Sequence, residues 1–113
     1  MVFTTLEFEA TSSSSGEIYA IEISRHGDNL TCTCTCPAGQ MGTYCKHRLG
    51  ILNGDASIAT GGDIDKMHLV GDMLAGTDVQ AALERLDTLE KQKADIDKQV
   101  KAAKKALART LNN

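Results

Sequence analysis

Hydrophobic and polar residues alternate over the first third of the chain, which is the spacing of strands with one buried face. Residues 2–9 are rich in β-branched and aromatic side chains and predict a first strand. Residues 17–23 and 30–36 alternate in the same way on either side of a turn that contains Gly27 and Asn29. Because these two residues accept positive φ angles, the two segments predict a β-hairpin.

The spacing becomes helical beyond residue 43. Residues 44–52 predict a short helix that ends at Asn53 and Gly54, a pair suited to a left-handed cap. Apolar residues at positions 64, 67, 70 and 74 predict a second short helix over residues 63–75. Three further segments carry turn-forming residues and show neither spacing, so we expect loops at 10–16, 37–43 and 55–62.

The last third of the chain predicts one long helix. No Gly or Pro interrupts residues 78–111, and Thr77 with Gln80 forms a capping box at its start. Apolar residues recur there with the 3-4 spacing of a coiled coil. The a positions are Val79, Leu86, Lys93, Val100 and Leu107, and the d positions are Ala82, Leu89, Ile96, Ala103 and Thr110.

At about 1.5 Å per residue this helix is about 50 Å long, more than so small a domain can cover. We therefore expect residues 78–111 to form a homodimer, with docking in a groove on another protein as the alternative. The five basic residues between 98 and 109 are expected to form a solvated face, with a modest nucleic-acid contact as the alternative.

Together these elements predict the α+β class and three parts. Residues 1–54 are expected to hold a β-hairpin and a short helix, 55–76 a linker with a second short helix, and 77–113 the long coiled-coil-like helix. The 113-residue chain contains only four aromatic residues. Because its core must be thin, a metal or a second chain is expected to add stability.

The formal net charge of −3 is unevenly distributed. Up to Thr77 the chain contains four Lys/Arg and nine Asp/Glu residues. From Asp78 onward it contains eight Lys/Arg and six Asp/Glu residues. This balance provides no overall attraction to nucleic acid. Residues 1–10 lack the features of a secretory leader, and no run of about 18 apolar residues suits a membrane. We therefore expect a cytoplasmic protein without a membrane partner, in which thiols stay reduced.

All four cysteines and one of the three histidines lie within residues 32–47. Thiolate sulfur and imidazole nitrogen at such short spacing are the ligands that a tetrahedral zinc ion takes, and disulfides or unrelated thiols are the alternatives. Cys34 and Cys36 share one face of a strand. Cys45 is expected just before or at the start of the following helix, with His47 in its first turn. Four such ligands leave no open position for a reactive water, which is typical of a structural zinc site.

The run Cys34-Thr35-Cys36-Pro37, a short loop and Cys45-Lys46-His47 together resemble the SWIM-type zinc finger. The resemblance covers residues 17–53 and implies a ββα unit around one Zn²⁺ per chain, with Cys34, Cys36, Cys45 and His47 as ligands. Cys32 stands where the family more often has a bulky residue, and so does Gly39. A Cys32-x-Cys34 pair could compete with Cys34-x-Cys36, although a non-ligand role for Cys32 is favoured.

The sequence contains no phosphate cradle, acidic pair or serine nucleophile motif, so nothing in it recommends an enzyme. The sequence favours a non-catalytic interaction module, an adaptor or inhibitor that binds a protein partner. The alternative is a DNA-binding zinc-finger protein, a common role in the family that the sequence resembles. In that case Lys46 and Arg48 are the candidate nucleic-acid contacts.

Overall fold

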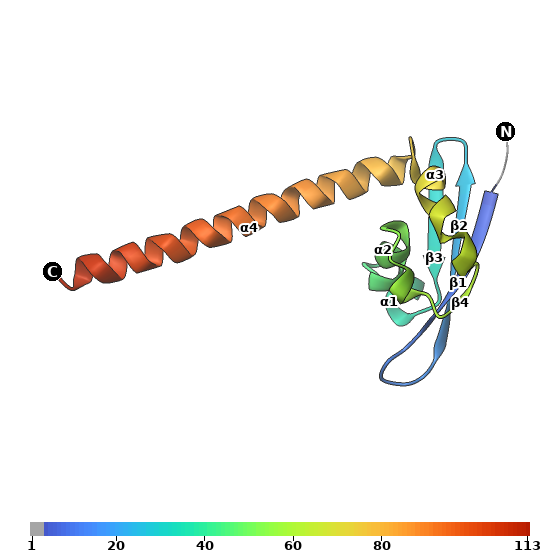
Figure 1. Ribbon diagram of the computed structural model, residues 1–113, viewed down its shortest axis with the longest axis horizontal. Helices are drawn as coiled ribbons and strands as arrows, with labels where there is room; N and C mark the ends of the chain where they lie inside the picture. The colour runs from blue at the N-terminus through green and yellow to red at the C-terminus, as the bar shows by residue number, and fades with distance from the viewer. Residues whose placement is uncertain (1–3) are drawn as a thin grey trace. The chain divides into compact units, whose positions relative to one another are not determined.

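The computed structural model describes residues 4–113 of the chain. The elements run in the order β1 (Thr4–Thr11), β2 (Ile18–His26), β3 (Asn29–Cys34), α1 (Pro37–Gln40), α2 (Lys46–Leu52), η1 (Ala56–Ile58), β4 (Gly61–Gly62), η2 (Ile64–Leu69), α3 (Val70–Leu74) and α4 (Asp78–Leu111) (Figure 1). The predicted α+β class is confirmed. The chain divides into two compact units, Met1–Gln80 and Ala81–Asn113.

The first unit is built on a four-stranded antiparallel sheet with strand order β3-β2-β1-β4. The predicted hairpin of β2 and β3 is confirmed, and its register places Ile21 opposite Cys34. The predicted strand at 2–9 is confirmed for its described part, while Val2 and Phe3 lie outside the described residues. β1 continues to Thr11, which pairs with Ile18 of β2.

One face of this sheet forms the core. Side chains alternate along each strand, so every second residue of β1 and β2 faces the helices. The most deeply buried large side chains combine sheet and helix residues: Phe8, Ile21, Ile23, Ile51 and Val70. Burying a side chain of this size contributes roughly 1.5–3 kcal/mol. The helix α2, which packs against β3 and α3, is thereby fixed on the sheet.

We expected residues 37–43 to form a loop, but this segment begins with the short helix α1. Pro37 occupies the first helical turn, where its fixed φ angle suits a helix and its missing N–H has no helical acceptor to reach. The Cys36 thiol caps this turn by accepting a hydrogen bond from the N–H of Gly39 at 3.3 Å. The preceding strand therefore ends at Cys34, two residues earlier than predicted.

The loop expected at 55–62 contains η1 and the fourth strand. Gly61 and Gly62 pair with Glu9 and Phe8, respectively, at the edge of β1. Gly62 has φ +83°, and a Cβ atom there would lie 2.7 Å from the Cα of Phe8. The glycine pair therefore marks a close approach of two backbones.

The single helix predicted over 63–75 consists of the 3₁₀ helix η2 followed by α3. Among its apolar residues, Met67, Val70 and Met73 are buried, while Ile64 is exposed. Residues 55–76, expected as a linker with a second short helix, contribute a strand and buried side chains to the first unit, which extends to Gln80.

The guanidinium of Arg25 ties α3 to the sheet. Its Nη1 donates to the carbonyl oxygens of Met73 at 3.1 Å and Ala75 at 2.7 Å. Its Nε donates to the carbonyl of Gly27 at 2.8 Å. A cation at the end of a helix satisfies carbonyl groups that have no partner within the helix.

The helix α4 begins where the capping box predicts. The hydroxyl of Thr77 accepts from the N–H of Gln80 at 3.3 Å, and the Gln80 side chain accepts from the N–H of Gly76 at 2.8 Å. Within the first unit, Asp78 accepts from the N–H of Leu30 at 3.0 Å.

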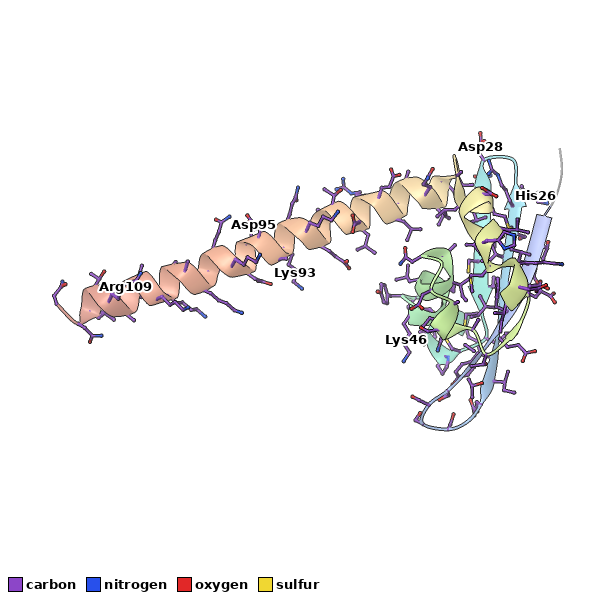
Figure 2. All side chains as sticks on the ribbon, viewed as in Figure 1. His26, Asp28, Lys46, Lys93, Asp95 and Arg109 are labelled. Carbon is purple, nitrogen blue, oxygen red and sulfur yellow. The ribbon has the colours of Figure 1, made fainter. Side chains whose placement is uncertain are left out.

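The helix spans 34 residues without a buried side chain. Lys93, Asp95 and Arg109 mark its course in Figure 2. Among the described residues, no helix is both long and apolar enough to cross a lipid bilayer.

Candidate metal centre

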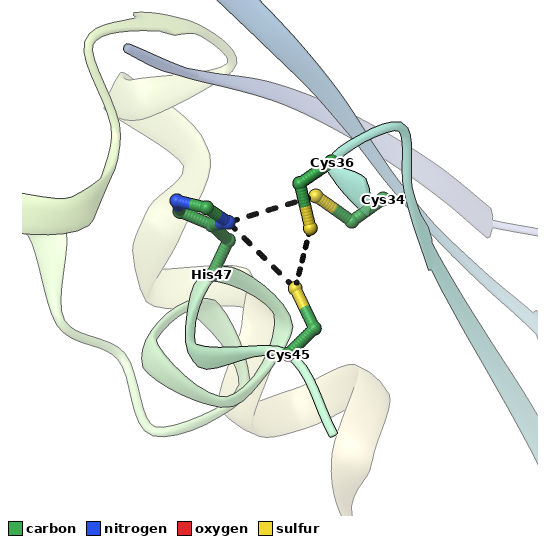
Figure 3. Close-up of side chains that lie close together, drawn as sticks. All are labelled: Cys34, Cys36, Cys45 and His47. Atoms are coloured by element: carbon green, nitrogen blue, oxygen red, sulfur yellow. Dashed lines mark hydrogen bonds between the residues drawn. The ribbon is translucent and has the colours of Figure 1, made fainter. Parts of the chain in front are cut away.

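Three cysteines and one histidine converge where β3 meets the first two helices (Figure 3). Cys34 is the last residue of β3, and Cys36 caps α1. Cys45 is the residue before α2, and His47 lies in the first turn of that helix, as predicted. The structure thus brings together all four predicted ligands, and their ligand atoms all lie within 4.8 Å of one another.

The spacing of these atoms fits a tetrahedral ion. The sulfur atoms of Cys36 and Cys45 are 3.3 Å apart, and the Nδ1 of His47 lies 3.9 Å from the Cys34 sulfur and 3.7 Å from the Cys45 sulfur. Bonds of about 2.3 Å to sulfur and about 2.0 Å to nitrogen place tetrahedral ligands about 3.5–3.8 Å apart. The donor set and its geometry therefore fit a soft or borderline metal ion.

The electrostatics of the cluster also favour a cation. Burial raises the pKa of the Cys34 thiol to about 12, and the side chains of Cys36 and Cys45 add to the rise. Burial also acts to raise the pKa of Cys45, but hydrogen bonds from the backbone of Arg48, from Cys36 and from His47 outweigh it and lower this pKa to about 6. Thiolates packed this closely repel one another, so all three form together only around a positive charge.

Cys32 lies on the same face of β3 but outside the cluster of ligand atoms. It is half-buried, and burial raises the pKa of its thiol to about 12. The structure pairs Cys34 with Cys36, Cys45 and His47 rather than with Cys32. This arrangement agrees with the predicted non-ligand role of Cys32.

Gly39 has a steric reason to be small. A Cβ atom at this position would lie 2.9 Å from the Cβ of Cys34 and would overlap the Cys34 carbonyl group. Because α1 turns back directly over a ligand residue, a larger side chain would displace Cys34. The departure from the family pattern at Gly39 therefore follows from the tight packing of α1 on β3.

The two candidate nucleic-acid contacts have different environments. Arg48 is half-buried and donates to the carbonyl oxygens of Cys32 and Thr43, which ties α2 to β3 and to the preceding loop. Lys46 is exposed and makes no hydrogen bond or ion pair recorded within residues 4–113 (Figure 2). Of the two predicted contacts, only Lys46 therefore presents its charge fully to the solvent.

An open cavity of about 690 Å³ lies beside the cluster and was not predicted from the sequence. Its walls come from the β1–β2 loop, the starts of α1 and α2, and η1. Its lining residues include many hydroxyl groups and Lys46, but no carboxylate. Tyr19 lines it as well, and the Tyr19 ring centroid lies 5.4 Å from that of His47. The tertiary contact between these rings had no signal in the sequence.

Residues 3–53 match the family model of the SWIM zinc finger. This segment is a SWIM zinc finger. The residues that the motif predicts as ligands form the cluster that could hold a metal ion. No curated protein and no solved structure matches the chain. The match begins well before residue 17 because the finger includes β1, which pairs with β2 along its whole length.

Proposed function

We propose that the protein is a non-catalytic interaction module whose SWIM finger is held together by one Zn²⁺ per chain. The observation that carries this proposal is the cluster of Cys34, Cys36, Cys45 and His47, in which three sulfurs and one nitrogen, the donor set of a zinc site, lie within 4.8 Å of one another. With four protein ligands, no coordination position is left for water or substrate. The ion supplies positive charge to the thiolates, and its ligands join the end of β3 to the start of α2.

The surface around the cavity supports binding of a protein partner. Tyr44 lines the cavity edge and is 70% exposed, and Met41 in the same loop is 78% exposed. Aromatic residues and methionine are enriched in protein interfaces. Binding at this surface is the way in which the protein would act as an adaptor or an inhibitor.

The helix α4 supports a homodimer. Its apolar residues repeat with heptad spacing, and the large apolar residues at a and d positions beyond Asp87 are exposed: Leu89, Ile96, Val100 and Leu107. A second copy of the helix would cover this stripe.

We place the protein in the cytoplasm, because its four cysteines are free thiols and a zinc centre needs them reduced.

Co-purification from the native host tests the proposed partner surface. We expect a protein that co-purifies with the wild type to be lost with Tyr44→Ala, while the zinc content of the variant stays unchanged. Ile18→Ala is the matched control, since Ile18 is 64% exposed on β2 and does not line the cavity. Equal recovery of the partner with all three proteins would contradict a docking surface at Tyr44.

DNA binding is the second candidate function. It is favoured by the exposed ammonium of Lys46 and by five basic residues on α4: Lys98, Lys101, Lys104, Lys105 and Arg109. A titration against duplex DNA at two salt concentrations distinguishes the two functions. Affinity that falls steeply with salt and drops further in Lys46→Glu supports DNA binding, because phosphate contacts release counterions. The absence of binding at low salt eliminates it.

A further inference from the structure

The exposed apolar stripe of α4 is interrupted at its centre by a charge. Leu89, Ile96, Val100 and Leu107 are between 45% and 59% exposed, and no residue of the helix is buried. Lys93 occupies the a position in the middle of this stripe. The position of Lys93 distinguishes the two ways in which two copies of the helix can pair.

We propose that α4 pairs with a second copy of itself in the antiparallel orientation, centred on Lys98. This proposal rests on the homodimer of the proposed function and specifies its geometry. In a parallel, in-register pair each a residue faces the same residue of the other chain, so Lys93 would meet Lys93 in an apolar seam. Reversing one helix brings a positions opposite d positions and separates the two ammonium groups.

The antiparallel register follows from the identities of the facing residues. Centred on Lys98, the pair places Lys93 opposite Ala103 of the second copy, a small residue beside which the lysine stem can lie while its ammonium reaches water. The same register places Ile96 opposite Val100 and Leu89 opposite Leu107. All four large apolar residues of the exposed stripe are then covered by apolar partners.

Shifts of the register by one heptad are less favourable. A shift one way places Lys93 opposite Ile96 and draws residues 76–80 into the overlap, although these residues belong to the first unit. A shift the other way leaves Leu89 without a partner. The register centred on Lys98 overlaps residues 83–113, which is nearly the whole second unit.

The flanking charges add complementarity. In this register the e position Glu90 lies beside Lys104 of the second copy, and the twofold symmetry makes this contact twice. The two copies of Asp97 meet at the centre, which is one repulsive contact against two attractive ones. In the parallel pair Glu90 would lie beside Arg85 of the second copy, and Lys104 would lie beside the uncharged Gln99.

A charge exchange therefore separates the two orientations. The dimer dissociation constant is measured by sedimentation equilibrium at low salt for the full chain. Lys104→Glu is expected to raise this constant about tenfold, because two attractions become two repulsions. Adding Glu90→Lys to the same chain is expected to restore the wild-type value. Lys105→Glu is the matched control, since it makes the same charge change at an outward-facing f position.

The parallel pair predicts different results. There, Lys104→Glu has the same effect as the control, and the double variant binds more weakly than the wild type because Glu90→Lys puts a positive charge beside Arg85. Either result overturns the antiparallel assignment while the homodimer stands. A wild-type chain that sediments at the monomer mass of 12.1 kDa overturns both the homodimer and its orientation. The zinc finger and its partner surface are unaffected by that outcome.

Discussion

Ile51 connects the metal centre to the hydrophobic core, so its truncation measures how closely folding and metal binding are linked. The side chain is fully buried on α2, four residues beyond His47. Ile51→Ala removes three carbon atoms, which corresponds to about 2.4 kcal/mol at about 0.8 kcal/mol per buried methylene. The cavity left behind raises the expected loss of folding free energy to about 3–4 kcal/mol.

This loss should appear in the affinity for zinc. Where a small domain folds only around its metal, the free energy of metal binding includes the free energy of folding. Each 1.4 kcal/mol then changes the zinc dissociation constant tenfold, so Ile51→Ala should raise the constant by roughly two to three powers of ten. Competition with a chromophoric chelator measures it, and Ile18→Ala, at a position 64% exposed, should stay within about threefold of the wild type.

Two observations together would show that folding and zinc binding are not linked. One is a zinc dissociation constant in Ile51→Ala equal to that of the wild type. The other is a wild-type finger that keeps its strand signal in circular dichroism after zinc is removed by a chelator. Folding would then be independent of the metal, and the thin core would be sufficient without it.

Three further predictions concern individual side chains and pH. Cys32→Ser should keep metal content near normal whereas Cys45→Ser should abolish it, as elemental analysis of the purified variants will show; equal loss in both would place Cys32 among the ligands. Arg25→Met should lower the free energy of unfolding in urea by about 2 kcal/mol, because the helix-end carbonyls lose a cationic donor, whereas the same change at exposed Arg85 should have little effect. Zinc affinity should fall at least tenfold per pH unit as the pH drops from 8 to 6, because the pKa of Cys34 at about 12 means that this thiol must release a proton on binding, and a pH-independent affinity would contradict this.

The parts of the fold that depend on local pattern could be predicted from the sequence. Alternating residues with turn formers between them specify the β2–β3 hairpin, and that hairpin places Cys34 on β3. The start of helical spacing after residue 43 places Cys45 and His47 at the beginning of a helix. Because all four ligands lie within a short stretch of chain, their convergence needs little tertiary information.

The features that the sequence did not predict depend on contacts between residues that are far apart in the chain. β4 is two glycines long and has no hydrophobic pattern, and it is a strand only because the edge of β1 lies beside it. In the sequence, Arg25 and Arg48 look like ordinary surface charges. Their hydrogen bonds to backbone carbonyl groups become visible only in the folded structure. The cavity beside the cluster is formed by loops from three separate regions, so its lining could not be assembled from spacing alone.

We propose that one zinc ion holds the finger together through three thiolates and one imidazole. The most direct test is the zinc content of the full chain, purified without chelator and measured by inductively coupled plasma mass spectrometry against protein concentration. We expect about one zinc per chain. Protein that is folded and contains no zinc would contradict it.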